Sequence, residues 1–185
     1  GRVAPVMTPV KDEEEMRERL TAFLMAGYPM GCIDNVEHPF GGASICVVLT
    51  QGAWRDRVLG RSETVTLPAA VTWTLTGNNV IFVGDIITRV VVCDLDPGLE
   101  RPEERTFEVD LYKWVPAHRA ELVAAGLTIL RAYHVAGCPD QGLKVFGRFE
   151  EWSRVVRSAL VWLGEADPCA GMDRLREADP VSEQL

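Results

Sequence analysis

Near the N-terminus the apolar residues recur with the period of an α-helix. One face of this helix would be apolar and would carry Met16, Leu20, Phe23 and Leu24. Asp12 suits the N-cap, and three glutamates follow it where negative charge meets the positive end of the helix dipole. Since Gly27 suits the other end, the pattern predicts an amphipathic helix over residues 12–26.

The middle of the chain alternates short apolar runs with turn residues. These runs predict strands over residues 29–33, 64–67, 71–76 and 90–95. The run over residues 71–76 alternates apolar and hydroxyl residues and is rich in β-branched types. Pro29 and Gly31 argue against residues 29–33 as a central strand, because both residue types are unfavourable there. The run Ala43–Thr50 follows a glycine pair and predicts a short helix.

The last third of the chain has helical periodicity. One apolar stripe comprises Leu122, Gly126, Ile129, Leu130 and Tyr133, and another comprises Phe149, Trp152, Val156, Ala159, Leu160 and Leu163. Gly164 would end the second helix. The sequence therefore predicts an α/β fold with a central sheet within residues 1–107, a helical lid over residues 108–166 and a polar, disordered tail over residues 167–185.

The composition is that of a globular protein without a membrane-spanning segment. The 185 residues are 47% hydrophobic and 25% charged, as in ordinary globular domains. No apolar run approaches the roughly 20 residues that a membrane helix needs, and no signal peptide precedes Lys11, so we expect a cytoplasmic protein with no membrane partner. The net charge of −8 argues against a large nucleic-acid-binding face but permits a local basic strip.

The cysteines and histidines carry no recognisable metal site. The five cysteines are scattered without a C-x-x-C pair, so neither a disulfide framework nor a zinc site is expected. The three histidines show no ligand spacing with each other or with the cysteines.

Polar residues follow two of the predicted strands. Asp34 ends the first strand, and Asn78 and Asn79 follow the strand over residues 71–76. A carboxylate at the edge of a sheet is suited to holding a metal ion, but an aspartate there also commonly begins a turn. Gly-Asn-Asn is likewise good turn chemistry, so the residues alone favour turns at both places.

Several short motifs nevertheless occur in one order along the chain. They are Cys32–Val36, Leu49–Thr50, Trp54–Gly60, Trp73–Asn79, Glu100–Phe107, Leu127–Tyr133, Phe149–Ser153 and Leu163–Gly164. In this order they resemble the C-terminal part of a phage or mobile-element primase-helicase ATPase of the AAA+/superfamily 3 type. The resemblance covers most of the chain and implies a partial P-loop NTPase-like sheet within residues 1–107, with ATP and Mg²⁺ as cofactors.

The resemblance implies roles for the polar residues at the strand ends. Asp34 and Asn35 would lie at the nucleotide, with Asp34 holding Mg²⁺ through water. Asn78 or Asn79 would be the amide that senses the γ-phosphate and the attacking water. Many members have a glutamate as general base where this chain has Asn35, so the base is unassigned and Glu37 is a candidate only by nearness.

Two arginines resemble catalytic or interface residues. Arg89 is similar to the arginine finger, which crosses a subunit boundary and stabilises charge on the transferred phosphoryl group, although relatives often have two adjacent arginines at this point. Arg105 is either a second phosphate-sensing arginine or one partner of a surface ion pair.

Three further arginines are candidates for binding single-stranded DNA. Arg55, Arg57 and Arg61 lie in the region that supplies a hairpin to the central pore in the resembled family. Asp56 and Glu63 offset part of their charge, so a solvated polar face is the alternative.

One part of the family pattern is absent from this sequence, the phosphate loop G-x-x-x-x-G-K-[ST]. Without it we do not expect tight ATP binding by this chain alone. Three hypotheses follow: the C-terminal portion of a DNA-dependent ATPase or helicase that forms a homo-oligomeric ring, a non-enzymatic interaction module derived from such a domain, or a chain that completes a site whose phosphate loop another polypeptide supplies.

Overall fold

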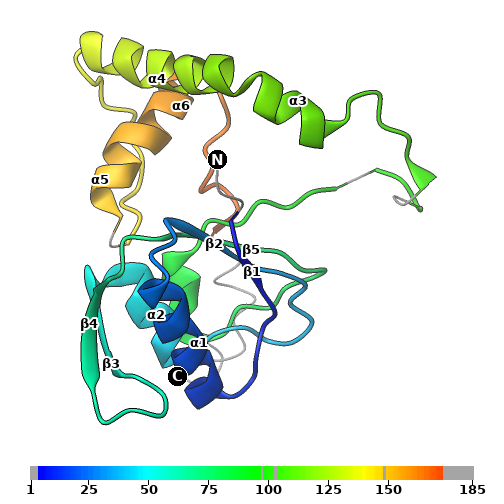
Figure 1. Cartoon of the computed structure of the whole chain (residues 1–185). Coiled ribbons are helices and arrows are strands. Elements are labelled where there is room, and N and C mark those ends of the chain that lie inside the picture. Colours follow the sequence, from blue (N-terminus) through cyan, green and yellow to red (C-terminus); the bar gives the residue numbers. More distant parts are fainter. Residues whose placement is uncertain (1–3, 97, 102–103, 148, 173–185) are drawn as a thin grey trace. The chain divides into compact units, whose positions relative to one another are not determined.

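The computed structural model describes residues 4–96, 98–101, 104–147 and 149–172 (Figure 1). It divides into two compact units, one formed by the chain up to Val90 together with Met172, and the other by Val91–Gly171. This division falls before the predicted boundary at residue 107, and most of the predicted tail lies outside the described residues. The fold is mixed α/β, with a small parallel sheet in the first unit and a set of helices in the second.

The first unit is built on a three-stranded parallel sheet. Its strands are β1 (Val6–Met7), β2 (Met30–Ile33) and β5 (Thr72–Leu75), in the order β1-β2-β5. Cys32 in the central strand lies opposite Val6 on one side and Thr74 on the other. The predictions of strands over residues 29–33 and 71–76 are thus confirmed, and the three strands end at the same edge.

The predicted N-terminal helix is confirmed as α1 (Glu13–Met25). The Asp12 side chain accepts a hydrogen bond from the backbone N–H of Glu15 (2.8 Å), and Gly27 follows the helix with a φ of 68°. The apolar face is buried as expected, and Phe23 packs against Trp73 of β5 with ring centroids 4.6 Å apart.

This packing explains the glycine in the central strand. A Cβ at Gly31 would lie 2.7 Å from ring atoms of both Phe23 and Trp73. Any side chain at this position would therefore displace one of the two rings. The residue that argues against a strand in the sequence is the one that lets α1 pack on the sheet.

The second helix, α2 (Ala43–Thr50), has the bounds that the sequence predicts. Its N-cap residue, Gly42, offers no side chain to the free N–H groups of the first turn. Glu13 of α1 supplies the cap instead, because its Oε1 accepts a hydrogen bond from the backbone N–H of Ser44 (2.6 Å). Ile45 and Val48 of α2 are buried.

An antiparallel hairpin completes the first unit. It consists of β3 (Ala53–Arg57) and β4 (Thr64–Pro68), of which only β4 is predicted from the sequence. Trp54 is buried, and its indole N–H donates to Oγ1 of Thr21 on α1 (2.9 Å). The same hydroxyl donates to Oδ2 of Asp56 (2.9 Å), so one face of the hairpin is fixed to α1.

The strand predicted over residues 90–95 is wrong. After β5 the chain forms the 3-10 helix η1 (Gly84–Arg89) and then continues through residues 90–95 without regular secondary structure. β-Branched residues favour a strand only where a neighbour satisfies the backbone hydrogen bonds. None of the described strands pairs with this run.

The second unit is helical, as predicted. It contains α3 (Leu111–Ala117), α4 (Arg119–Val135), α5 (Glu150–Trp152), the π-helical segment η3 (Ser153–Arg157) and α6 (Ser158–Leu163). The end of α4 lies beside α6 (Figure 1), where the rings of Tyr133 and Trp162 are 5.7 Å apart. Gly164 ends α6 with a φ of 99°. Among the described residues no helix is both long and apolar enough to cross a bilayer.

A partly buried ion pair joins segments of the second unit. Nε and Nη2 of Arg157 donate to the two carboxylate oxygens of Asp167 at 2.7 and 2.6 Å, and Nη1 donates to the carbonyl of Lys144 (2.8 Å). The Arg157 side chain is 6% exposed. The hydrogen bonds from Arg157 lower the pKa of Asp167 below its usual value. The pair ties the loop before α5 to the segment after α6.

Candidate functional site

The candidate site lies at the carboxyl edge of the parallel sheet, where β2 and β5 end side by side. The backbone N–H of Thr76 donates to the carbonyl of Ile33 (3.0 Å), and that of Val36 donates to the carbonyl of Thr76 (2.9 Å). The hydroxyl of Thr76 donates to Oδ1 of Asp34. The strand geometry thus places an exposed carboxylate and a hydroxyl together at the end of the central strand.

The turn after β2 presents further polar groups at this edge. Asn35 has a φ of 60°, a conformation that asparagine tolerates better than most residues. Its side-chain amide donates to Oε1 of Glu37 (2.8 Å), and both residues are exposed. Val36 between them is 1% exposed and anchors the turn in the core. Glu37 therefore lies two residues from Asp34, but nothing in the geometry assigns it as a base.

The loops after β2 and β5 are in close contact. A Cβ at Gly77 would lie 2.5 Å from the carbonyl oxygen of Val36, so only glycine fits without a shift of backbone. Further along, the backbone N–H of Phe40 donates to the carbonyl of Ile81 (2.8 Å), and the two loops form a short parallel bridge between Phe40 and Phe82. The loops thus continue the pairing of the strands and fix the position of Asp34.

Asn78 and Asn79 are exposed in the turn after Gly77. Asn79 has a φ of 51°, as expected of turn chemistry. Within the described part of the chain, neither side-chain amide has a hydrogen-bond partner. Both amides are therefore available to a ligand at the same edge as Asp34, while the sensor role stays a prediction.

Arg89 is placed differently from what an arginine finger requires. Its side chain is 6% exposed, and its guanidinium donates to Oγ1 of Thr50 (2.8 Å) and to Oδ2 of Asp85. A finger must extend from the surface to reach a neighbouring subunit. In this structure Arg89 instead joins η1 to the end of α2, so its role as a finger stays a prediction that the geometry does not favour.

Arg105 lies in the second unit and is exposed. Its guanidinium carbon is 5.2 Å from the ring centroid of Phe107, within the range of a cation–π contact. Among the described residues of this stretch, an ion pair joins Arg101 and Glu104 (2.9 Å). Neither proposed role of Arg105 is tested by this placement.

The arginines of the predicted DNA-binding strip lie on the β3–β4 hairpin. Arg55 and Arg57 are exposed on the face opposite Trp54, directly across from Thr66 and Thr64 of β4. Among the described residues neither guanidinium forms an ion pair, whereas Arg61 at the hairpin end lies 4.0 Å from Glu63. Alternate residues of a strand are about 7 Å apart, so Arg55 and Arg57 form a pair of free cations on one face.

The site residues fit Mg²⁺ in part. Magnesium sites commonly use one or two carboxylates together with water and phosphate oxygens. Asp34 offers such a carboxylate, with its Oδ1 held by Thr76 and its Oδ2 without a hydrogen-bond partner in the described structure. Across the described ranges no group of three or more His, Cys, Asp or Glu side chains could hold a metal by itself.

The same residues do not fit the phosphates of ATP. The sequence has no phosphate loop, and α1 has Asp12 as its N-cap and three glutamates in its first turn, whose charge would repel a phosphate group. The described part of the chain thus contains a carboxylate and amides for a metal–phosphate ligand but no cradle for it.

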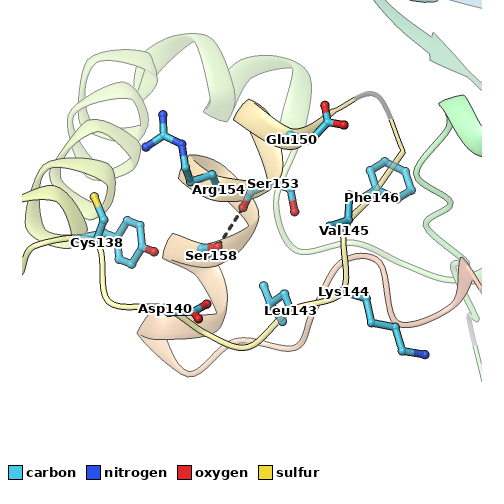
Figure 2. A pocket seen from close by; sticks show the side chains of 11 residues that line it. Cys138, Asp140, Leu143, Lys144, Val145, Phe146, Glu150, Ser153, Arg154 and Ser158 are labelled. Carbon is cyan, nitrogen blue, oxygen red and sulfur yellow. Dashed lines mark hydrogen bonds between the residues drawn. The ribbon is translucent and has the colours of Figure 1, made fainter.

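A separate hollow of about 350 Å³ lies within the second unit (Figure 2). Its walls come from α5, η3, α6 and the segment before them, with Asp140, Glu150 and Arg154 among the polar lining residues. Ser158 donates a hydrogen bond to the carbonyl of Ser153 there (3.0 Å). None of the residues predicted for function lines this hollow.

Thr76 is the site residue that sequence reasoning missed. It was included in the predicted strand, and its partner Asp34 is 42 positions earlier, so no local pattern joins them. The available signal was a hydroxyl residue at the end of a predicted strand, directly before a glycine.

Comparison of the chain with protein-family models, with curated proteins and with solved structures finds no match.

Proposed function

We propose that this chain supplies the metal-binding and phosphate-sensing edge of a DNA-dependent ATPase of the helicase type, and that it is inactive without a phosphate loop from elsewhere. One observation carries the proposal: Asp34 ends the central strand of a parallel sheet, with its carboxylate beside the end of β5. Ligands of open parallel sheets bind outside the carboxyl ends of the strands.

Each part of the edge has a role in this proposal. Asp34 would hold Mg²⁺, and Thr76 orients the carboxylate through its hydrogen bond. Asn78 and Asn79 would be the donors available to the terminal phosphate of a nucleotide held by a phosphate loop from elsewhere. When bound, the metal ion would neutralise charge on the phosphates. Arg55 and Arg57 contact the backbone of single-stranded DNA from the hairpin.

A non-enzymatic interaction module is the second candidate. The lack of a phosphate cradle and the acidic start of α1 favour it. A domain that does not bind nucleotide needs no phosphate loop, and it can carry negative charge at this helix N-terminus. The two candidates differ in whether Asp34 binds a divalent cation at all.

Paramagnetic broadening of the protein's amide NMR signals by Mn²⁺ distinguishes them. We expect millimolar Mn²⁺ to broaden the signals of residues 34–37 and 76–79 first, since a single carboxylate binds the ion weakly. Asp34→Asn should remove this local effect, whereas the matched control Asp94→Asn, at another exposed carboxylate, should preserve it. If Asp34→Asn does not change the broadening, the metal site is refuted and the interaction module is the remaining candidate.

A further inference from the structure

The thiol of Cys138 lies beside the imidazole of His134 at the end of α4. Sγ of Cys138 and Nδ1 of His134 are 3.8 Å apart, a hydrogen-bond contact for sulfur. His134 is exposed and Cys138 is half-buried, so a reagent in solvent can reach both. A thiol within reach of a neighbouring base is the arrangement that activates a cysteine as a nucleophile.

The backbone at the end of α4 holds this pair in place. Gly137 and Cys138 have φ values of 85° and 50°, so the chain folds back over the last turn of the helix. The backbone N–H of Gly137 donates to the carbonyl of His134 (3.0 Å), and that of Cys138 donates to the carbonyl of Tyr133 (3.1 Å). These two bonds form a Schellman motif. The Tyr133 hydroxyl also donates to the carbonyl of Pro139 (3.1 Å), which fixes the residue after the cysteine.

Cys138 also lines the hollow of about 350 Å³ in the second unit. Figure 2 shows Cys138 at one side of this hollow and Phe146 at the opposite side. Tyr133 and Val145 are among the other apolar lining residues. The charged lining residues are two of each sign, Asp140, Lys144, Glu150 and Arg154. A hollow of this size admits a small molecule, and its balanced charge favours an uncharged one.

The other four cysteines do not combine these features. Burial raises the pKa of the Cys46 and Cys169 thiols, which lowers the fraction of the reactive thiolate. For the thiols of Cys32 and Cys93, the described part of the chain supplies no hydrogen-bonding base. Cys93 is nevertheless exposed, so it provides an internal standard for a thiol that reacts through accessibility alone.

We propose that Cys138 is a modification site, whose thiol reacts with small uncharged electrophiles such as hydrogen peroxide while His134 acts as the base. The thiol proton passes to Nδ1 of His134 in the tautomer that is protonated at Nε2. The sulfur attacks one peroxide oxygen, and the O–O bond breaks as the S–O bond forms. The leaving hydroxide takes the proton from His134, so the products are a sulfenic acid and water, and the sulfur has lost two electrons to the peroxide. This site does not depend on the proposed function of the sheet edge.

Alkylation of the folded, full-length chain with limiting iodoacetamide, an uncharged electrophile, tests the proposal. Peptide mass spectrometry gives a rate for each cysteine. We expect Cys138 to react at least about fivefold faster than Cys93, although Cys93 is the more exposed of the two. Hydrogen peroxide followed by dimedone, which traps sulfenic acids, should likewise label Cys138 before Cys93.

Histidine variants separate the action of a base from mere exposure of the thiol. His134→Gln should slow alkylation of Cys138 at least about threefold and leave the rate of Cys93 unchanged. Because His134 is exposed, its circular dichroism spectrum should match that of the wild type. His118→Gln is the matched control, at a histidine that stacks on Trp114 instead (4.2 Å between ring centroids), and should leave the rate of Cys138 unchanged.

Two results would overturn the modification site. One is a Cys138 that reacts no faster than Cys93 with iodoacetamide and takes up no dimedone after peroxide. The other is an unchanged rate of Cys138 in His134→Gln, which would mean that the imidazole does not act on the thiol.

Discussion

The hydroxyl of Thr76 donates a hydrogen bond to the carboxylate of Asp34, a residue 42 positions earlier. This contact joins the ends of two parallel strands at an exposed aspartate. The backbone N–H of Asn35 also donates to the Thr76 hydroxyl (3.3 Å). The Thr76 hydroxyl thus accepts a hydrogen bond from the turn and orients the carboxylate of the candidate site.

Replacement of Thr76 by valine should therefore cost stability and release Asp34. We expect the free energy of unfolding to fall by about 1 kcal/mol, because one hydrogen bond to a charged group is lost at an exposed position. Urea denaturation followed by circular dichroism measures the change. Thr66→Val on the exposed face of β4 is the control and should change stability by less than about 0.5 kcal/mol. Equal effects at the two positions would contradict a specific role for Thr76.

The contact between Gly77 and Val36 predicts that a side chain at position 77 lowers the free energy of unfolding by more than Thr76→Val does. In Gly77→Ala the new Cβ would meet the Val36 carbonyl oxygen at 2.5 Å, so one of the two loops must move. We expect a loss of about 2 kcal/mol in thermal or urea unfolding. Gly52→Ala, where a Cβ meets nothing within 4 Å, is the control and should be neutral or slightly stabilising. A neutral Gly77→Ala would mean that the loops are not held in this contact.

Arg89→Ala separates the structural role of this arginine from a finger role. If Arg89 joins η1 to α2, its removal should destabilise the chain by about 2 kcal/mol, through the lost hydrogen bond to Thr50 and the cavity that is left. A finger that acts only on a neighbouring subunit would leave the unfolding of the isolated chain unchanged. Arg55→Ala, at an exposed arginine, is the control and should have little effect.

The Arg157–Asp167 pair predicts a pH dependence of stability. Because the pKa of Asp167 is lowered in the folded chain, the unfolded chain binds more protons as the pH falls below about 5. The contribution of the pair should be fully present above the unfolded pKa of about 3.9 and should be lost as the pH falls through the folded value. Asp167→Asn should cost about 3 kcal/mol near neutral pH and flatten the acid limb of the curve. If the stability of this variant falls at low pH as steeply as that of the wild type, other carboxylates cause the loss of stability in acid.

The free cations of the hairpin predict salt-dependent DNA binding. Fluorescence anisotropy of a labelled oligothymidine should give a log–log salt slope that becomes shallower by about 0.7 for each phosphate contact removed. Arg55→Gln with Arg57→Gln should thus reduce the slope by about 1.4. Arg101→Gln, which removes an arginine paired with Glu104, should leave it unchanged. An identical slope in all three proteins would favour the solvated-face alternative.

Local patterns in the sequence predicted the elements that depend on local interactions. The cap at Asp12, the apolar face of α1 and the stop at Gly164 all act within a few residues, and the structure confirms the helices that they define. The predicted strand over residues 90–95 failed because a strand also requires a partner, which no local pattern reveals. The pairing of Asp34 with Thr76 likewise could not be predicted from local patterns, since it depends on the register of β2 with β5.

The cap that Glu13 gives to α2 makes one helix depend on the other. An isolated helix of eight residues is unstable in water, and α2 has no capping side chain of its own. Its first turn is completed by a carboxylate from the start of α1, which reaches Ser44 in the folded arrangement of the two helices. The stability of the second helix therefore depends on the first, and a substitution that removes the Glu13 carboxylate should loosen the start of α2, 31 residues further along the chain.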